Sequence, residues 1–455
     1  MKPDEVEDIY TLSPMQQGIL FHSLSEQSAF LEQGIGTLNG VIDVEAFTRS
    51  WQMVVDHHQI LRTAFVWKTV NKPVQIVHRC VKIPFQYLDW QAVPFPKRKR
   101  DLQDLLKADR QQQIALEVPP LMRLTLIRMM ENQYEFIWSI HHLIHDSWST
   151  SLLLQQVFDC YEAIRHNKEI KLNTCPPYRD YITWLKERDL STATKFWRER
   201  LRGYKHTALL PVDTYTTIDN ESRYNRQELF LSKGETQQIV TFTRQQRTTI
   251  NILIQSIWAV LLGYYSKRKD IIFGSVVSGR SPELVAVEKM IGVFINTLPI
   301  RIQLTPDQQW QALLSVLQSI HAEQSCYDYT PLTHIQRCSE ITAGSPLFES
   351  ILVYQNSFED LTNVCRGGLL FKNIRYEGHP NYPLMLRVWP ASQLRLEIVY
   401  DQRRWQVGTI NRLLNGVYRL LNLTNEMKNA DLQALFSVLQ RIDREEKESI
   451  FKQRR

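Results

Sequence analysis

The chain has 455 residues, of which 43% are hydrophobic and 22% are charged. This length exceeds what one hydrophobic core usually supports, so we expect two domains, and the composition excludes an intrinsically disordered chain. The formal net charge of +6 is too small to indicate nucleic acid in preference to an acidic protein partner or a plain solvated surface.

The N-terminal stretch MKPDEVEDIY is acidic and lacks the apolar core of a signal peptide, which indicates a cytoplasmic protein. The most apolar helical stretch, 250–265, carries Asn251 and Gln255 and is too short and polar to span a bilayer. The six cysteines show no CxxC spacing, so a zinc ribbon or redox motif is not indicated and reduced thiols are expected.

Helices and strands alternate through the first half of the chain. Ser13, Pro14 and Gln16 form the start of a helix with a capping box. Apolar spacing predicts a second helix at 43–57 and another after Ser149, which is its expected N-cap. Runs of β-forming residues predict strands at 60–67 and 74–77, joined in a hairpin, and a strand pair at 121–129 and 134–140.

The second half repeats this alternation. A crossover is expected at about 175–197, and a polar loop or linker at 210–223. Helices are predicted from Ser232, at 250–265 and from Val407, with a highly charged tail at 441–455. Strands are predicted at 270–277, 293–302, 348–354, 384–389 and 394–400. Two α/β lobes are therefore expected.

The stretch HHLIHDSWS at 141–149 follows the predicted strand that ends at residue 140. Adjacent residues on a strand point to opposite faces, so one histidine should face a cavity and the other the interior. A histidine of near-neutral pKa can accept a proton from a nucleophile. Asp146 could orient the imidazole of His142, or pair with an arginine as a structural acid.

Other interpretations of this stretch need weighing. His141 and His145 have the HxxxH spacing of zinc enzymes, but His142 replaces the glutamate base of HExxH and the preceding run is strand-like, so no metal is expected. If the two adjacent histidines stood alone, the first interpretation would be a pair of buried, hydrogen-bonded histidines with a structural role. No GxSxG nucleophile elbow is present, which favours direct acyl transfer between two bound substrates.

Several motifs together resemble the condensation domains of nonribosomal peptide synthetases, which belong to the chloramphenicol-acetyltransferase-like acyltransferases. HHLIHDSWS is similar to their HHxxxDGWS signature. The other matching segments, in family order, are LSPMQQGILFHSL at 12–24, HHQILRTAF at 57–65, YRDYITWL at 178–185, IGVFINTLPIR at 291–301, YDYTPL at 327–332 and PLFESILVYQN at 346–356.

The resemblance implies an α/β fold of two acetyltransferase-like lobes in a V-shaped pseudodimer with an active-site tunnel between them. We place the N-terminal lobe, with the HHxxxD motif, at 1–176, and the C-terminal lobe, with its crossover and linker segments, at 177–455. The implied enzyme is an acyltransferase of secondary metabolite biosynthesis that forms peptide bonds. It would transfer an aminoacyl or peptidyl thioester to the α-amine of an aminoacyl acceptor.

The implied partners are donor and acceptor peptidyl carrier proteins and the adjacent synthetase domains, with no nucleic acid or membrane. Both substrates would be carried on 4′-phosphopantetheine arms of the carriers, and no cofactor would be bound by the domain itself. The segment at 12–24 has the form common where the donor ends in a D-residue.

The resemblance also assigns roles to residues. His142 would be the catalytic histidine, and His141 would support the end of the strand. Asp146 would be structural, in a buried ion pair with Arg62. Trp148 and Ser149 keep the condensation pattern. Ser278 and Asn296 are expected near the tunnel.

Ser147 departs from the family, which usually has glycine there. If the position needs a positive φ or close substrate approach, a serine adds strain or narrows the channel. A non-catalytic recruitment module of the same fold, an epimerization domain, and a free-standing acyltransferase that uses coenzyme A or makes an ester remain alternatives. The DGxSW order of epimerization domains and the DxxxxD motif of cyclization domains are absent.

Overall fold

The computed structural model describes residues 3–25, 30–170, 172, 174–205, 210–213, 223–342, 344–355, 365–378 and 382–453. The chain forms two compact units. Unit 1 comprises Met1–Arg188, Gly279–Ile295 and Ser357–His379. Unit 2 comprises Asp189–Ser278, Asn296–Asn356 and Pro380–Arg455.

This partition differs from the division expected at residue 176. Residues 177–188 belong to unit 1, and two later segments of the chain return to it. The expected boundary assumed that each lobe is one continuous piece of chain. Return segments of about 20 residues carry no composition signal that distinguishes them from surface loops, so the sequence does not reveal them.

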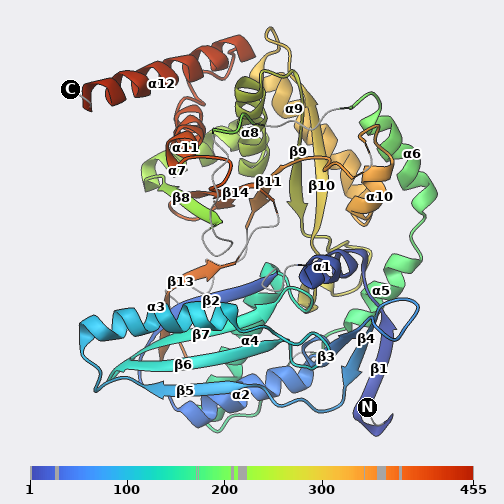
Figure 1. Ribbon diagram of the computed structural model, residues 1–455, viewed down its shortest axis with the longest axis vertical. Coiled ribbons are helices and arrows are strands. Elements are labelled where there is room, and N and C mark those ends of the chain that lie inside the picture. The colour runs from blue at the N-terminus through green and yellow to red at the C-terminus, as the bar shows by residue number, and fades with distance from the viewer. Residues whose placement is uncertain are drawn as a thin grey trace. The chain divides into compact units, whose positions relative to one another are not determined.

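The described strands of unit 1 form two sheets (Figure 1). The smaller has the order β1-β4-β3, and the larger has the order β12-β13-β2-β7-β6-β5. Their bounds are β1 Val6–Thr11, β2 Leu31–Asn39, β3 Thr63–Val66, β4 Val74–His78, β5 Phe85–Asp89, β6 Met122–Met130, β7 Gln133–His141, β12 Cys365–Arg366 and β13 Leu369–Glu377. The predicted hairpins β3–β4 and β6–β7 are both confirmed as antiparallel pairs.

Helices cover both faces of the larger sheet of unit 1. The helices of this unit are α1 Pro14–Ser25, α2 Val44–His57, α3 Phe95–Gln111, α4 Ser147–Arg165 and α5 Tyr178–Lys186, with short 3-10 turns at Pro3–Glu5, Gln59–Arg62 and Val287–Lys289. On one face, Leu106 of α3 packs against Ile35, Ile127 and Ile137. On the other face, Phe136 packs against aromatic rings of α2, because residues alternate between the faces of β7.

The described strands of unit 2 form a six-stranded sheet in the order β10-β9-β11-β14-β15-β8. Its strands are β8 Tyr224–Phe230, β9 Asp270–Val277, β10 Asn296–Gln303, β11 Ser350–Tyr354, β14 Leu384–Trp389 and β15 Arg395–Asp401. Its helices are α6 Leu190–Leu201, α7 Lys233–Gln245, α8 Ile250–Ser266, α9 Trp310–Gln324, α10 Leu332–Arg337, α11 Val407–Asn422 and α12 Leu432–Gln453, with a 3-10 turn at Ser325–Tyr327.

The core of unit 2 surrounds α8 (Figure 1). This helix is buried from Ile252 to Gly263, because most of its side chains are apolar and the buried Gln255 and Ser256 are hydrogen-bonded. Its neighbours in the core include Leu313 of α9, Leu414 of α11 and residues of β9 and β14. α7 follows the predicted start at Ser232, and Ser232 and Glu235 form a capping box there.

Some predicted elements have different bounds in the structure. A 3-10 turn occupies Gln59–Arg62, so β3 begins only at Thr63. The expected crossover contains α5 and α6, and most of the charged tail lies in α12. Residues 214–222 of the predicted linker lie outside the described part of the chain. None of the described helices is both long and apolar enough to cross a membrane by itself. α7 and α8 together have the length and composition of a membrane span, but the chain bends by 98° between them.

Candidate active site

The double histidine lies where β7 ends. Buried side chains, including Trp138 and Ile140, hold this strand in the sheet up to His141. The backbone N–H of His142 donates to the carbonyl oxygen of Phe30, at 2.9 Å, so the segment before β2 fixes its position. His141 is buried, whereas 23% of the His142 side chain is exposed.

A carboxylate from β2 faces the two histidines that follow the strand. Oε2 of Glu32 lies 3.1 Å from Nε2 of His142, and Oε1 lies 3.8 Å from Nε2 of His145. The two imidazole rings are stacked, with centroids 4.9 Å apart and an angle of 6° between their planes. Nδ1 of His142 lies 3.3 Å from the carbonyl oxygen of His145. Both ring nitrogens of His142 therefore have oxygen neighbours.

The electrostatics of this group favour charge on Glu32 and His142. Burial alone would raise the pKa of Glu32, but the hydrogen bond from His142 and the nearby imidazole of His145 lower it well below its usual range. Burial would likewise lower the pKa of His142, but the hydrogen bond and the negative charge of Glu32 outweigh it and raise that pKa. The pair is thus stabilised in its ionised form.

His141 has a different environment. Its Nδ1 accepts a hydrogen bond from the backbone N–H of Leu143, at 3.2 Å, and its Nε2 lies 3.3 Å from the hydroxyl of Ser23 on α1. Burial and the nearby His142 and His145 lower the pKa of His141 to about 3. This histidine is held neutral and ties the end of β7 to α1.

Asp146 is fully buried and caps α4. Its Oδ1 accepts hydrogen bonds from the backbone N–H of Ser149 and from its hydroxyl, both at 2.8 Å. Nη2 of Arg280 lies 3.2 Å from the same oxygen, and Oδ2 accepts from the backbone N–H of Phe294 at 3.0 Å. A buried carboxylate with this many donors is a structural centre, because few acceptor positions are left for a substrate.

Arg280 belongs to the return segment Gly279–Ile295 of unit 1. Only 5% of its side chain is exposed, and it also donates to the carbonyl oxygens of Val287 and Met290, while its guanidinium lies 4.1 Å from the ring centre of Phe294. Gly292 accommodates the ring of Tyr178, since a Cβ there would lie 2.2 Å from it. The segment is therefore packed closely around Asp146.

Glu32, His142 and His145 are also a group that could hold a metal ion, with ligand atoms within 4.8 Å of one another. Coordination requires nitrogen lone pairs that converge on one ion. The two rings are almost parallel and stacked, and an imidazole lone pair lies in the plane of its ring, so the lone pairs of the two Nε2 atoms do not meet at one ion. The geometry suits a bridging carboxylate better. His141, one of the two histidines with HxxxH spacing, is not in the group.

A family model described as "Condensation domain" matches residues 6–448. This chain belongs to the condensation domain family. A linear gramicidin synthase polypeptide of Brevibacillus parabrevis is 37% identical over 420 residues, which are 91% of this chain and 5% of that protein. Bacitracin synthase 3 of Bacillus licheniformis is 33% identical over 419 residues, or 90% of this chain and 6% of that protein. The domain thus spans a small part of each of these relatives.

Solved structures show the same fold. The starter condensation domain of rhizomide synthetase superposes with a TM-score of 0.75 at 17% identity, over 94% of this chain and 98% of that chain. The X-domain from teicoplanin biosynthesis gives a TM-score of 0.78 at 18% identity, over 95% of this chain and 97% of that chain. The mixed α/β architecture expected from the sequence is therefore confirmed.

One expected contact of this condensation domain is wrong. Asp146 does not pair with Arg62, because its cation is Arg280. Arg62 is buried beside the smaller sheet, where its Nη1 lies 2.5 Å from Oε2 of Glu7 and also donates to the carbonyl oxygens of His78 and Arg79. The 3-10 turn before β3 directs its side chain toward β1 and β4.

The residues that follow Asp146 differ from expectation in two ways. Ser149 is not the N-cap of α4; Asp146 is, and Ser149 donates to it from the first turn. Ser147 is the first residue of α4 and has no positive φ, so backbone strain at this position is not an argument against a serine. The indole N–H of Trp148 donates to the carbonyl oxygen of Glu288, at 2.9 Å, and 40% of Trp148 is exposed.

Ser278 and Asn296 lie in unit 2, at the same end of the β9–β10 pair. Ser278 is exposed. The side-chain amide of Asn296 donates to the carbonyl oxygens of Asp328 and Thr330, both at 2.7 Å, which fixes the turn after α9. Their place in a substrate tunnel stays a prediction.

Sequence reasoning missed Glu32 and Arg280. Glu32 lies in a strand that contains two glycines, which is a weak strand signal. Arg280 stands 134 residues after its partner. Glu32 is the one charged residue of the stretch LEQGIGTLN at 31–39, and this was a usable signal because a buried charge needs a partner.

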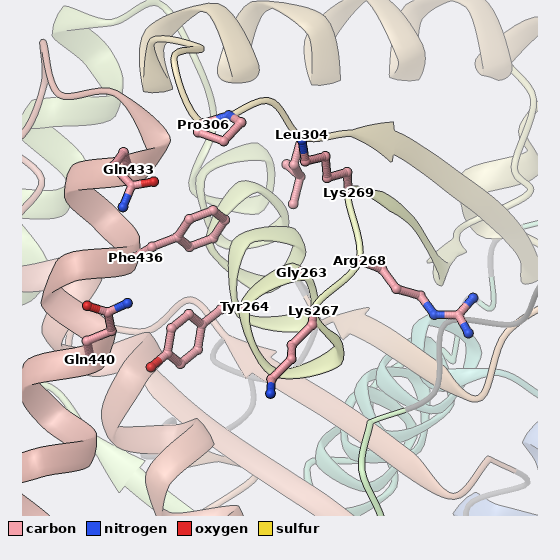
Figure 2. A pocket seen from close by; sticks show the side chains of 10 residues that line it. All are labelled: Gly263, Tyr264, Lys267, Arg268, Lys269, Leu304, Pro306, Gln433, Phe436 and Gln440. Atoms are coloured by element: carbon pink, nitrogen blue, oxygen red, sulfur yellow. The ribbon is translucent and has the colours of Figure 1, made fainter.

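A surface pocket of unit 2 holds none of these residues (Figure 2). Lys267, Arg268 and Lys269 extend from the loop between α8 and β9, and the rings of Tyr264 and Phe436 face one another with centroids 6.0 Å apart. The residues that line it include no histidine and no carboxylate, so the histidine-centred group of unit 1 has no counterpart there.

Proposed function

We propose that this domain catalyses peptide-bond formation between two carrier-bound thioesters. The observation that carries the proposal is His142: its imidazole is the partly exposed member of the HHxxxD stretch, while His141 and Asp146 are buried and engaged in holding β7 and α4. An accessible imidazole beside a rigid, buried support is the arrangement that general base catalysis requires.

In the proposed reaction the α-amine of the acceptor attacks the thioester carbonyl of the donor. A C–N bond forms and the C–S bond breaks. His142 takes the proton that the attacking amine loses and then gives it to the departing thiolate, which becomes the thiol of the donor's phosphopantetheine arm, so His142 returns to its starting state. Asp146, Arg280 and Ser149 act by holding the main chain on which His142 stands.

The experiment mixes the domain with a loaded donor carrier and a loaded acceptor carrier and follows carrier-bound products by mass spectrometry. We expect His142→Ala to lower the rate of dipeptidyl-thioester formation by about 10²-fold or more, since positioned acid–base groups contribute that much. His166→Ala is the matched control, because His166 is an exposed histidine at the end of α4.

Three results would contradict the proposal. Unchanged product with His142→Ala would remove the histidine from catalysis. Exchange of the α-hydrogen on a carrier-bound peptide without amide formation would indicate epimerization. Equal product from a soluble thioester without carriers would indicate a free-standing acyltransferase.

We further propose that the donor ends in a D-residue and that the partners are peptidyl carrier proteins of a synthetase. The form of the segment LSPMQQGILFHSL at 12–24, which covers α1 except for its last residue, supports the stereochemistry. Two donors that differ only in the configuration of their last residue test it. We expect more product from the D-donor; equal yields would contradict this part of the proposal.

A further inference from the structure

His142 has an acceptor oxygen beside each ring nitrogen. The carbonyl oxygen of His145 lies 3.3 Å from Nδ1, and Oε2 of Glu32 lies 3.1 Å from Nε2. A carbonyl and an ionised carboxylate can only accept hydrogen bonds. Both ring nitrogens must therefore carry hydrogens in this arrangement, and an imidazole that carries both is a cation.

An imidazolium cannot take a proton from an amine. For His142 to act as a base, its Nε2–H proton must leave and the contact with Glu32 must open, because a nitrogen lone pair 3.1 Å from a carboxylate oxygen would be repelled. When the contact between Glu32 and His142 opens, the carboxylate of Glu32 still has a second imidazole nearby. Nε2 of His145, which is buried and has no hydrogen-bond partner among the described residues, lies 3.8 Å from its other oxygen.

We propose that Glu32 is the positioning residue of His142: its carboxylate bridges His142 and His145, fixes the orientation of the catalytic ring, and sets the pH above which that ring becomes a base. This inference rests on the proposed function of His142 and adds a residue to it. Glu32 acts through His142 and does not react itself.

Other titratable or charged groups surround the pair and contribute to its titration. On the strand and loop they are His141, His145 and Asp146, with Tyr376 on β13 and His22 on α1 behind the ring of Phe30. Asp146 adds to the rise in the pKa of His142, but Glu32 is the neighbour with the largest effect in that direction. A change at Glu32 should therefore move the titration of His142 more than a change elsewhere.

The first test is the pH profile of kcat/KM for condensation. A raised pKa keeps His142 protonated to higher pH, so wild-type activity should rise only as the pH passes that pKa. In Glu32→Gln we expect this acidic limb to move to lower pH by about one unit or more, because an opposite charge at this distance shifts a pKa by that much. We also expect a lower plateau at high pH, because the ring is less well oriented.

Two variants separate this role from general damage to the fold. Glu32→Asp keeps the charge and should leave the acidic limb closer to that of the wild type than Glu32→Gln does. Glu135→Gln is the matched control, since Glu135 is a partly buried carboxylate of β7 that accepts from Thr37 at 2.9 Å and does not contact His142. A plateau loss in Glu32→Gln with an unmoved acidic limb would overturn the proposal.

The second test does not depend on turnover. Imidazole resonances of isotopically labelled protein are titrated, and the His142 signal is assigned by its loss in His142→Gln. We expect it to titrate at lower pH in Glu32→Gln than in the wild type. An unmoved signal overturns the role of Glu32 even if condensation is observed, whereas a shifted signal in a protein without condensation activity supports that role and contradicts the proposed function.

Discussion

Two connections in this molecule have the same plan and different chemistry. In unit 1 the antiparallel pair β6–β7 leads through residues 142–146 into α4, and in unit 2 the pair β14–β15 leads through residues 402–406 into α11. Each connection contains or adjoins a buried aspartate, Asp146 in the first and Asp401 in the second. The two connections differ in the ionisable side chains that lie around the aspartate.

Around Asp401 the cations are guanidinium groups. Nε of Arg223 lies 2.9 Å from its Oδ2, and Arg403 donates to both of its oxygens, at 3.1 and 2.8 Å. Burial would raise the pKa of Asp401, but the hydrogen bonds from Arg403 and Arg223 lower it. Arginine does not release its proton in proteins, so this connection is permanently charged and structural. The connection in unit 1 adds the imidazole of His142 beside the carboxylate of Glu32, and an imidazole, unlike a guanidinium, can release its proton.

The largest expected effect concerns the buried pair of unit 1. Both partners of the Asp146–Arg280 contact are almost fully buried, so removal of either leaves an unpaired buried group. We expect Asp146→Asn and Arg280→Gln each to lower the free energy of unfolding by about 3–5 kcal/mol. Chemical denaturation measures this.

A double-mutant cycle identifies the partner. Asp146→Asn and Arg280→Gln should be strongly non-additive, whereas Asp146→Asn and Arg62→Gln should add within about 0.5 kcal/mol. Strong coupling to Arg62 and none to Arg280 would contradict the structure.

Asp401 should matter less than Asp146, because its arginine partners are partly exposed. We expect Asp401→Asn to lower the free energy of unfolding by about 1–3 kcal/mol and to leave the rate of condensation within about two-fold. Glu131→Gln, an exposed carboxylate in the β6–β7 turn, is the control. A large loss of activity without a loss of stability would show that the second connection is also part of the active site.

Buried histidines of unit 1 should make stability depend on pH. Burial lowers the pKa of His58 to about 4, against an ordinary value of 6.5, although its Nε2 lies 2.6 Å from the side-chain oxygen of Gln156. Between these values the unfolded chain binds a proton that the folded chain does not, so stability falls as the pH falls from about 6.5 toward 4.

The slope of the free energy of unfolding against pH should be smaller in His58→Gln than in the wild type, by at most about 1.4 kcal/mol per pH unit. Thermal unfolding midpoints between pH 7 and 5 measure it, with the exposed His166→Gln as control. Identical slopes for His58→Gln and wild type would disagree with a neutral, buried His58.

The smallest effect is expected at Ser147. Since this residue begins α4 without a positive φ, Ser147→Gly should change stability by less than about 1 kcal/mol and the rate of condensation by less than about two-fold. A tenfold change in rate would mean that the Ser147 side chain affects substrate approach, as the sequence comparison with the family suggested.

The sequence predicted elements whose apolar pattern is long and unbroken. In unit 1, α2, α4 and the β6–β7 pair are of this kind and supply buried apolar side chains to its core, as α8 does in unit 2. It did not predict β2, because the pattern there is interrupted by glycine. A Cβ at Gly34 would lie 2.0 Å from the indole of Trp138, so a cross-strand ring takes the space of the missing side chain.

Only the residues of the candidate site that lie close together in the sequence could be predicted. His141, His142 and Asp146 stand in one short stretch and were found together. Glu32 and Arg280 come from segments about a hundred residues away on either side, and nothing in a single sequence shows which of many charged residues will meet a given partner. The wrong assignment of Arg62 has this cause.

Unit 1 is assembled from three separate stretches of chain, and this constrains how the domain can be recombined with its relatives. A chimaera joined near residue 188 would take the double histidine and Asp146 from one parent and Arg280, with the rest of Gly279–Ile295, from the other. Its buried ion pair would then be a hybrid. Exchange of substrate-handling parts between such enzymes should therefore succeed more often when that later stretch and Ser357–His379 are transplanted together with the N-terminal piece.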